Sequence, residues 1–113
     1  MHEYWMKTDV NKLPDVKDSG LVFSQDSEAN LIGVEVYDGN TPVELTGDIT
    51  ANVVRANGTT IEIDGDSEDN RAWVVLDEDA YAVVGNIGVF IKLASGTMVT
   101  TLGGVEAYVY KSR

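Results

Sequence analysis

Residues 64–70 (DGDSEDN) form the densest group of side chains in this sequence that could do chemistry, because their carboxylates are the oxygen ligands that calcium takes. The acids are Asp64, Asp66, Glu68 and Asp69, followed by Asn70. The helical calcium-binding loop needs acidic or amide residues at positions 1, 3 and 5, glycine at position 6 and glutamate at position 12. Counted from Asp64, glycine falls at position 2 and Val75 at position 12. We therefore expect a solvated acidic hairpin turn, without a metal or another cofactor.

Residues for nucleophilic or acid–base catalysis are scarce. The sequence has no cysteine, and its one histidine is His2, which stands too close to the N-terminus to be held rigidly as a general base. Glu35 and Glu44 could meet across strands as the acid and base of a glycosidase, but glutamate is common at solvent-facing strand positions. We therefore expect that the protein is not an enzyme.

The charge balance excludes two classes of partner. The 113 residues include 19 Asp and Glu against 8 Lys and Arg, which gives a net charge of −11. This charge repels a phosphate backbone and an anionic membrane surface, so we expect neither nucleic acid nor membrane as a partner. The sequence also lacks an apolar run near the roughly 20 residues of a membrane span, and its first residues lack the basic start and long apolar segment of a signal peptide. We expect a protein that is made and used without the secretion machinery.

The strands that must position any site are visible as apolar residues that alternate with polar ones. The expected strands are residues 20–24, 31–37, 49–55, 59–63, 71–76, 86–94 and 98–110. Asn57-Gly58, between two of them, is the strongest short-range signal for a β-hairpin. About seven short strands without a helical period predict an all-β, immunoglobulin-like antiparallel β-sandwich over residues 20–113.

The expected centre of this sandwich is residues 80–110, two strands that face each other across a turn at Ser95-Gly96. Gly103-Gly104 interrupts the second strand and is typical of a bulge. One helical turn is expected before this hairpin, with Asp77 as its N-cap. Trp73, on the strand before that turn, is expected in the core.

Residues 1–19 differ from the rest and predict an extended N-terminal arm. They are polar and charged, with Tyr4, Trp5 and Met6 together near the front. These three side chains either pair with the edge of the domain's own sheet or dock on a neighbouring subunit. Aromatic residues and methionine are enriched in interfaces, which keeps the second alternative open.

Tyr108 and Tyr110 lie two residues apart and so share one face of the last expected strand. An exposed tyrosine there could bind a sugar or a protein, whereas a covered sheet edge is the simpler alternative. With Tyr4, Trp5 and Met6, they complete the set of candidate interface residues.

The order of several short motifs resembles a known family. The motifs are Asn57-Gly58-Thr59-Thr60, the strand Trp73-Val74-Val75-Leu76, the turn over residues 77–85, the strand over residues 86–93, Thr100-Thr101-Leu102-Gly103 and Val109-Tyr110. In this order, over residues 31–110, the chain resembles the N-terminal domain of phage baseplate upper proteins. Such domains usually open a longer protein, with a coiled coil or fibre after the sandwich.

The resemblance implies a ligand-free β-sandwich without catalytic residues. It also implies a bacteriophage virion protein, made in the host cytoplasm, whose domain anchors a baseplate, tail or fibre component. Its partners would be other virion proteins and further copies of itself, as a homo-oligomer. Two alternatives remain: a capsid decoration or head-fibre base protein, and a carbohydrate-binding module that uses Tyr108 or Tyr110.

Overall fold

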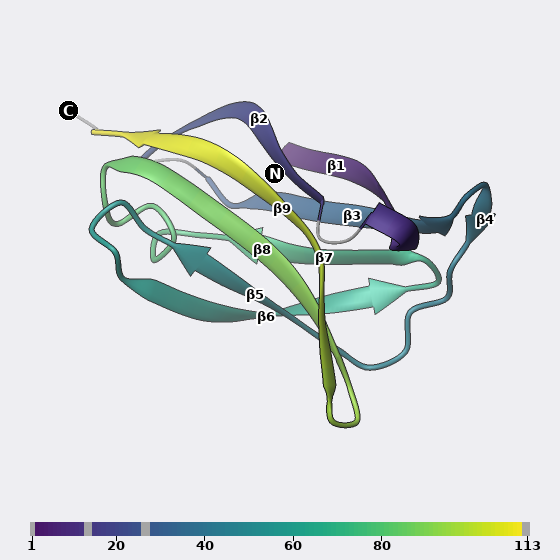
Figure 1. The fold of residues 1–113 in the computed structure, drawn as a ribbon. Helices are drawn as coiled ribbons and strands as arrows, with labels where there is room; N and C mark the ends of the chain where they lie inside the picture. Colours follow the sequence, from purple (N-terminus) through teal and green to yellow (C-terminus); the bar gives the residue numbers. More distant parts are fainter. Residues whose placement is uncertain (1, 13–14, 26–27, 112–113) are drawn as a thin grey trace.

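The computed structural model describes residues 2–12, 15–25 and 28–111, and these form an all-β fold with one short 3-10 helix (Figure 1). The elements in chain order are β1 (His2–Asp9), η1 (Val10–Lys12), β2 (Asp15–Ser24), β3 (Asn30–Asp38), β4 (Thr41–Pro42), β5 (Asp48–Val54), β6 (Thr60–Glu68), β7 (Arg71–Leu76), β8 (Gly85–Ser95) and β9 (Met98–Tyr110). No helix in these described ranges has the length and apolar character to cross a membrane.

The strands belong to one curled sheet, a half-barrel, in the order β1-β3-β7-β6-β5-β8-β9-β2, with the short β4 paired to β3. Most neighbours are antiparallel, but β1 runs parallel to β3 and β2 runs parallel to β9. The expected antiparallel, seven-stranded, immunoglobulin-like sandwich is therefore corrected to a mixed sheet. Alternation shows which residues face a core, but it carries no information about strand direction.

The stretch expected to be an extended arm supplies the two edge strands of this sheet. β1 pairs with β3 along its whole length, from His2↔Asn30 to Asp9↔Tyr37, and β2 continues across the boundary expected at residue 19. Asp9 holds the end of β1, because its carboxylate accepts hydrogen bonds from the backbone N of Asn11 at 2.8 Å and of Gly39 at 3.2 Å. The hydrogen bond from Asn11 helps to lower the pKa of Asp9 below its ordinary value.

A bend in β6 lets the sheet curl. The first half of β6 pairs with β5, up to Thr50↔Asp64, and the second half pairs with β7, from Gly65↔Val74 onward. A side chain at Gly65 would place its Cβ 2.3 Å from the carbonyl oxygen of Trp73, so only glycine fits where the strand changes partner. Because β6 continues to Glu68, the acidic turn is shorter than the one expected over residues 64–70. Residues 64–68 are strand, and the turn is confined to Asp69 and Asn70.

The inner faces of the strands enclose one apolar core. It is built from alternate residues of the central strands, among them Val34, Val36, Ala51, Val53, Val74, Leu76, Val89, Ile91, Val105 and Val109, all nearly or fully buried. The alternation expected for residues 49–53 and 87–91 is confirmed, as is the hairpin at Asn57-Gly58. The bulge expected in β9 is present, since pairing shifts between Ile91↔Gly103 and Lys92↔Thr101 and leaves Leu102 as the extra residue.

The turn before β8 carries Tyr81, the largest fully buried side chain among the residues that the structure describes. Backbone bonds from Ala80 N and Tyr81 N to the carbonyl oxygen of Asp77 form one turn, but no helix follows. Tyr81 packs against Phe23 of β2, with 5.1 Å between ring centroids, and its hydroxyl accepts a 2.7 Å hydrogen bond from the side-chain amide of Asn30. Tyr81 thus joins one edge strand, β3 and this turn.

Tyr81→Phe tests this buried contact through pH. Burial raises the pKa of the Tyr81 phenol above its ordinary value of 10.0, because the core disfavours the phenolate. The stabilising effect of the neutral phenol is fully present below pH 10 and is lost as pH rises above it. We expect Tyr81→Phe to lower the free energy of unfolding by about 1 kcal/mol near neutral pH. At alkaline pH, the free energy of unfolding of the variant should decrease less with pH than that of the wild type. Denaturant titrations between about pH 8 and 11 measure both effects.

The control is Tyr108→Phe, which leaves Tyr81 intact. This variant should lose as much stability at alkaline pH as the wild type does. An unchanged pH slope in Tyr81→Phe would contradict the buried position of this phenol.

Candidate functional site

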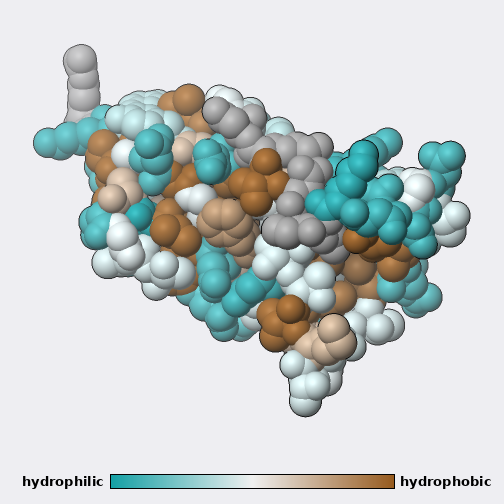
Figure 2. Space-filling view, in the orientation of Figure 1, coloured by the Kyte–Doolittle hydropathy of each residue, from teal (hydrophilic) through white to brown (hydrophobic). Residues whose placement is uncertain are grey.

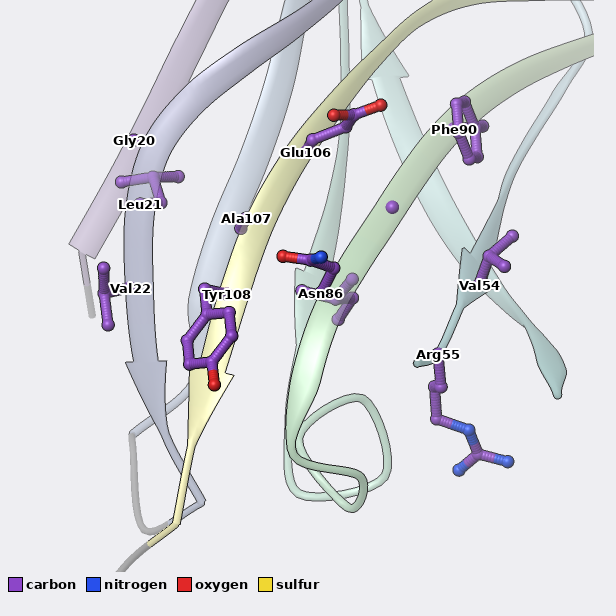
Figure 3. A pocket seen from close by; sticks show the side chains of 12 residues that line it. Gly20, Leu21, Val22, Val54, Arg55, Asn86, Phe90, Glu106, Ala107 and Tyr108 are labelled. Carbon is purple, nitrogen blue, oxygen red and sulfur yellow. The ribbon is translucent and has the colours of Figure 1, made fainter. Parts of the chain in front are cut away.

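A groove crosses the outer face of β2, β9, β8 and the end of β5 (Figure 3). It has a volume of about 710 Å³. Two rows of paired residues run across it, Val22↔Tyr108↔Asn86 and Glu106↔Gly88↔Val54. The groove therefore combines apolar surface from Val22 and Val54 with amide, carboxylate and phenol groups.

Two glycines leave room for the Phe90 ring, which lines this groove. A Cβ at Gly88 would lie 2.8 Å from the ring of Phe90, and one at Gly104 would lie 2.6 Å from it. The Phe90 ring thus lies over Gly104, its partner on β9, and reaches Gly88 along its own strand. An aromatic ring over a cross-strand glycine stabilises a sheet where a side chain is missing. The apolar end of the groove is therefore a fixed part of the sheet.

Both tyrosines of the candidate set are exposed on this face. Tyr108 is 44% exposed and Tyr110 is 47% exposed, on the side of β9 that faces away from the core. The edge of β9 beside them is covered by β2, through the pairs Val22↔Tyr108 and Ser24↔Tyr110, while part of each tyrosine side chain stays exposed. At the other end of the groove, Arg55 is held by hydrogen bonds from its guanidinium to Thr59 Oγ1 at 2.9 Å and to the carbonyl oxygen of Asp79 at 3.3 Å.

The aromatic residues of the N-terminal segment divide between the two faces of the sheet. Met6 is 4% exposed and lies in the core, and Tyr4 packs against that core. Trp5 points outward over Gly33, its partner on β3, where an added Cβ would lie 2.3 Å from the indole ring. The structure therefore matches the alternative in which this segment pairs with the domain's own sheet. A contact of Met6 with another subunit would require β1 to leave the sheet.

A second cluster surrounds Trp5 on the outer face of β1, β3 and β7. Trp5 meets Trp73 edge to face, with 6.2 Å between centroids, and Arg71 lies 5.2 Å from the centroid of Trp5. Arg71 also pairs with Glu35 at 3.6 Å. Trp73, expected in the core, is half-buried on the outside, because Ala72, Val74 and Leu76 occupy the inner positions of β7.

The acidic residues of β6 do not converge on a point. The side chains of Glu62, Asp64, Asp66 and Glu68 are exposed at every second position, so they follow the strand as a stripe. Among the described residues, no three His, Asp or Glu side chains are grouped to hold a metal ion. The structure does not favour Glu35 and Glu44 as the acid and base of a glycosidase. The Glu35 carboxylate forms an ion pair with Arg71 and accepts a 3.0 Å hydrogen bond from the hydroxyl of Tyr37.

The fold defines this protein as a small all-β domain made of one curled mixed sheet. No protein-family model and no curated protein sequence matches this chain. Among solved structures, the fold is similar to the N-terminal domain of phage TP901-1 ORF48, with a TM-score of 0.63. The similarity covers 98% of this chain and 100% of that one, at 11% sequence identity. The two chains thus share a complete fold.

A double-mutant cycle tests the packing of Trp5 on Gly33. Gly33→Ala forces the indole away, and overpacking of this kind costs about 1–3 kcal/mol of unfolding free energy. With Trp5→Ala already present, the same change should be neutral or slightly stabilising, because alanine is favoured over glycine inside a strand. Unfolding titrations of the four proteins give the coupling energy. Equal effects of Gly33→Ala in both backgrounds would contradict the ring position.

Proposed function

We propose that this chain is a non-catalytic structural domain of a bacteriophage virion, which anchors a baseplate, tail or fibre component to the particle. The observation that carries the proposal is the likeness to the N-terminal domain of a phage protein over the whole of both chains. The motif order over residues 31–110, which resembles baseplate upper proteins, supports the same assignment.

The proposed partners are other virion proteins and further copies of this chain. Its net charge of −11 argues against nucleic acid and against an anionic membrane surface. The outer faces offer the residue types that dominate protein interfaces, namely tryptophan, tyrosine and arginine, at Trp5, Trp73, Tyr108, Tyr110 and Arg71. The protein would be made in the host cytoplasm and would function in the virion.

Quantitative mass spectrometry of purified particles tests this proposal. Particles from the phage that encodes the chain are separated into heads and tails, and its peptides are counted against those of the major tail protein. We expect the chain in the tail fraction, in several copies per particle. Its presence in heads would favour the capsid decoration or head-fibre alternative. Its absence from both fractions would contradict a virion role.

A carbohydrate-binding role is the second candidate, favoured by the exposure of Tyr108 and Tyr110 beside the groove. Aromatic faces next to amide and carboxylate groups can bind sugar rings. If this role holds, the chain should bind host cell-wall polysaccharide, and Tyr108→Ser should weaken the binding at least tenfold. Binding is measured by calorimetry, with Tyr37→Ser as the control on the opposite half of the sheet. Absence of binding by the wild type would rule this role out.

A further inference from the structure

A separate pocket, of about 360 Å³, lies on the outer face of β7 beside the two tryptophans of the chain. Trp5 and Trp73 line it together with Arg71, Glu68 and Asp69. In Figure 2, teal hydrophilic residues prevail at the end of the molecule that carries β4 and the turn between β6 and β7, and the acidic side of this pocket belongs to that turn. The pocket thus places aromatic rings beside carboxylates, a combination that attracts cations.

One cation of this chain already uses such an arrangement. The guanidinium of Arg71 lies 5.2 Å from the centroid of Trp5 and forms a 3.6 Å ion pair with Glu35. The Trp5 ring also packs on Gly33, its cross-strand partner. Trp5 is therefore engaged within the domain, and Arg71 shows the contact that this face favours, a guanidinium that touches an indole ring and a carboxylate together.

Trp73 is surrounded by the same groups. It is half-buried, and its cross-strand partner on β6 is Asp66. Glu68 is the partner of Arg71, and Asp69 follows in the turn. Among the described residues, no ion pair includes any of these three exposed carboxylates, and no cation lies over Trp73. The face therefore repeats the groups that hold Arg71, without a second cation from its own chain.

The acidic residues of β6 favour an extended partner along this strand. Asp64, Asp66 and Glu68 are exposed at every second position, so they recur about every 7 Å. A segment in an extended conformation presents its own side chains on one face at the same interval. Basic residues at alternate positions of such a segment would each lie opposite an acid.

The charge of the chain selects a basic partner for this face over a further copy of itself. A net charge of −11 repels acidic surfaces and attracts basic ones. The bases of this face are already matched in register with an acid, in the row Lys7↔Glu35↔Arg71, so the carboxylates of β6 are in excess. Because the attraction is between exposed charges, it should weaken as salt rises.

We propose that this face binds an extended, arginine-bearing segment of another protein, with one guanidinium over Trp73 and against the carboxylates of Asp66 and Glu68. Arginine suits the pocket better than lysine, because its planar guanidinium stacks on aromatic rings and pairs with a carboxylate through two hydrogen bonds. The inference rests on the proposed function for the partner's identity as a neighbouring virion protein, whereas the chemistry of the segment follows from the face alone.

The tryptophans make the pocket directly observable, because both of those in the chain line it. The probe is the end-blocked peptide GRGRGRG, and its control is GKGKGKG, which has the same charge. We expect GRGRGRG to shift the indole N–H resonances of the full chain saturably, and to bind about fivefold more tightly than GKGKGKG in calorimetry. Trp73→Leu should abolish this preference for arginine while the carboxylates still bind both peptides.

Paired acid variants locate the contact. We expect Asp66→Asn with Glu68→Gln to weaken the binding of GRGRGRG about tenfold. Asp48→Asn with Glu78→Gln removes the same charge at exposed acids elsewhere and should leave the affinity nearly unchanged. No indole shift with GRGRGRG, equal affinity for the two peptides, or equal weakening by the two pairs of substitutions would overturn the proposal. If these tests fail while the chain is found in particles, only this contact is wrong. If they succeed while particles lack the chain, the proposed virion role is wrong and the binding face stands.

Discussion

The change of partner in β6 is the constraint on which the rest of the structure depends. A flat sheet of these strands would leave its apolar inner face open to water, and burial of that face is the main favourable term in folding. The bend at Gly65 brings the β3–β7 half of the sheet against the β5–β8–β9 half, so one core serves both. The 2.3 Å approach to the carbonyl of Trp73 leaves room for glycine alone. The curl also fixes which faces remain outside.

Each outer face is stabilised by a ring that lies over a glycine. Trp5 covers Gly33 on one half of the sheet, and Phe90 covers Gly104 on the other. In both pairs the glycine is the cross-strand partner, so the missing side chain makes space for the aromatic one. These rings are exposed enough to be contacted and packed enough to be rigid. The outer faces are therefore preorganised surfaces, which the proposed assembly role requires.

The sequence predicted the inner faces well, because alternation is a local property. The spacing of the apolar residues in 49–53 and 87–91 alone predicts the alternate residues that face the core. The direction and order of the strands depend on distant pairing, and nothing local to β1 indicated that it runs parallel to β3. The size of Trp73 predicts a core position, but the burial of Ala72 and Val74 beside it places Trp73 on the opposite, outer face of β7. The charges of residues 64–68 predict a loop, because acidic side chains at most positions hide the two-residue period that the strand follows.

The central claim, a virion part that is held in several copies through its outer surfaces, is tested most directly by a high-resolution electron cryomicroscopy map of the particle. The account predicts density for this curled sheet in symmetry-related copies at the tail, with the core closed and the outer face of β9 or β3 against a neighbouring protein. A map that resolves every tail protein and contains no such domain would contradict the account. So would a copy of the domain whose outer faces all lie open to solvent.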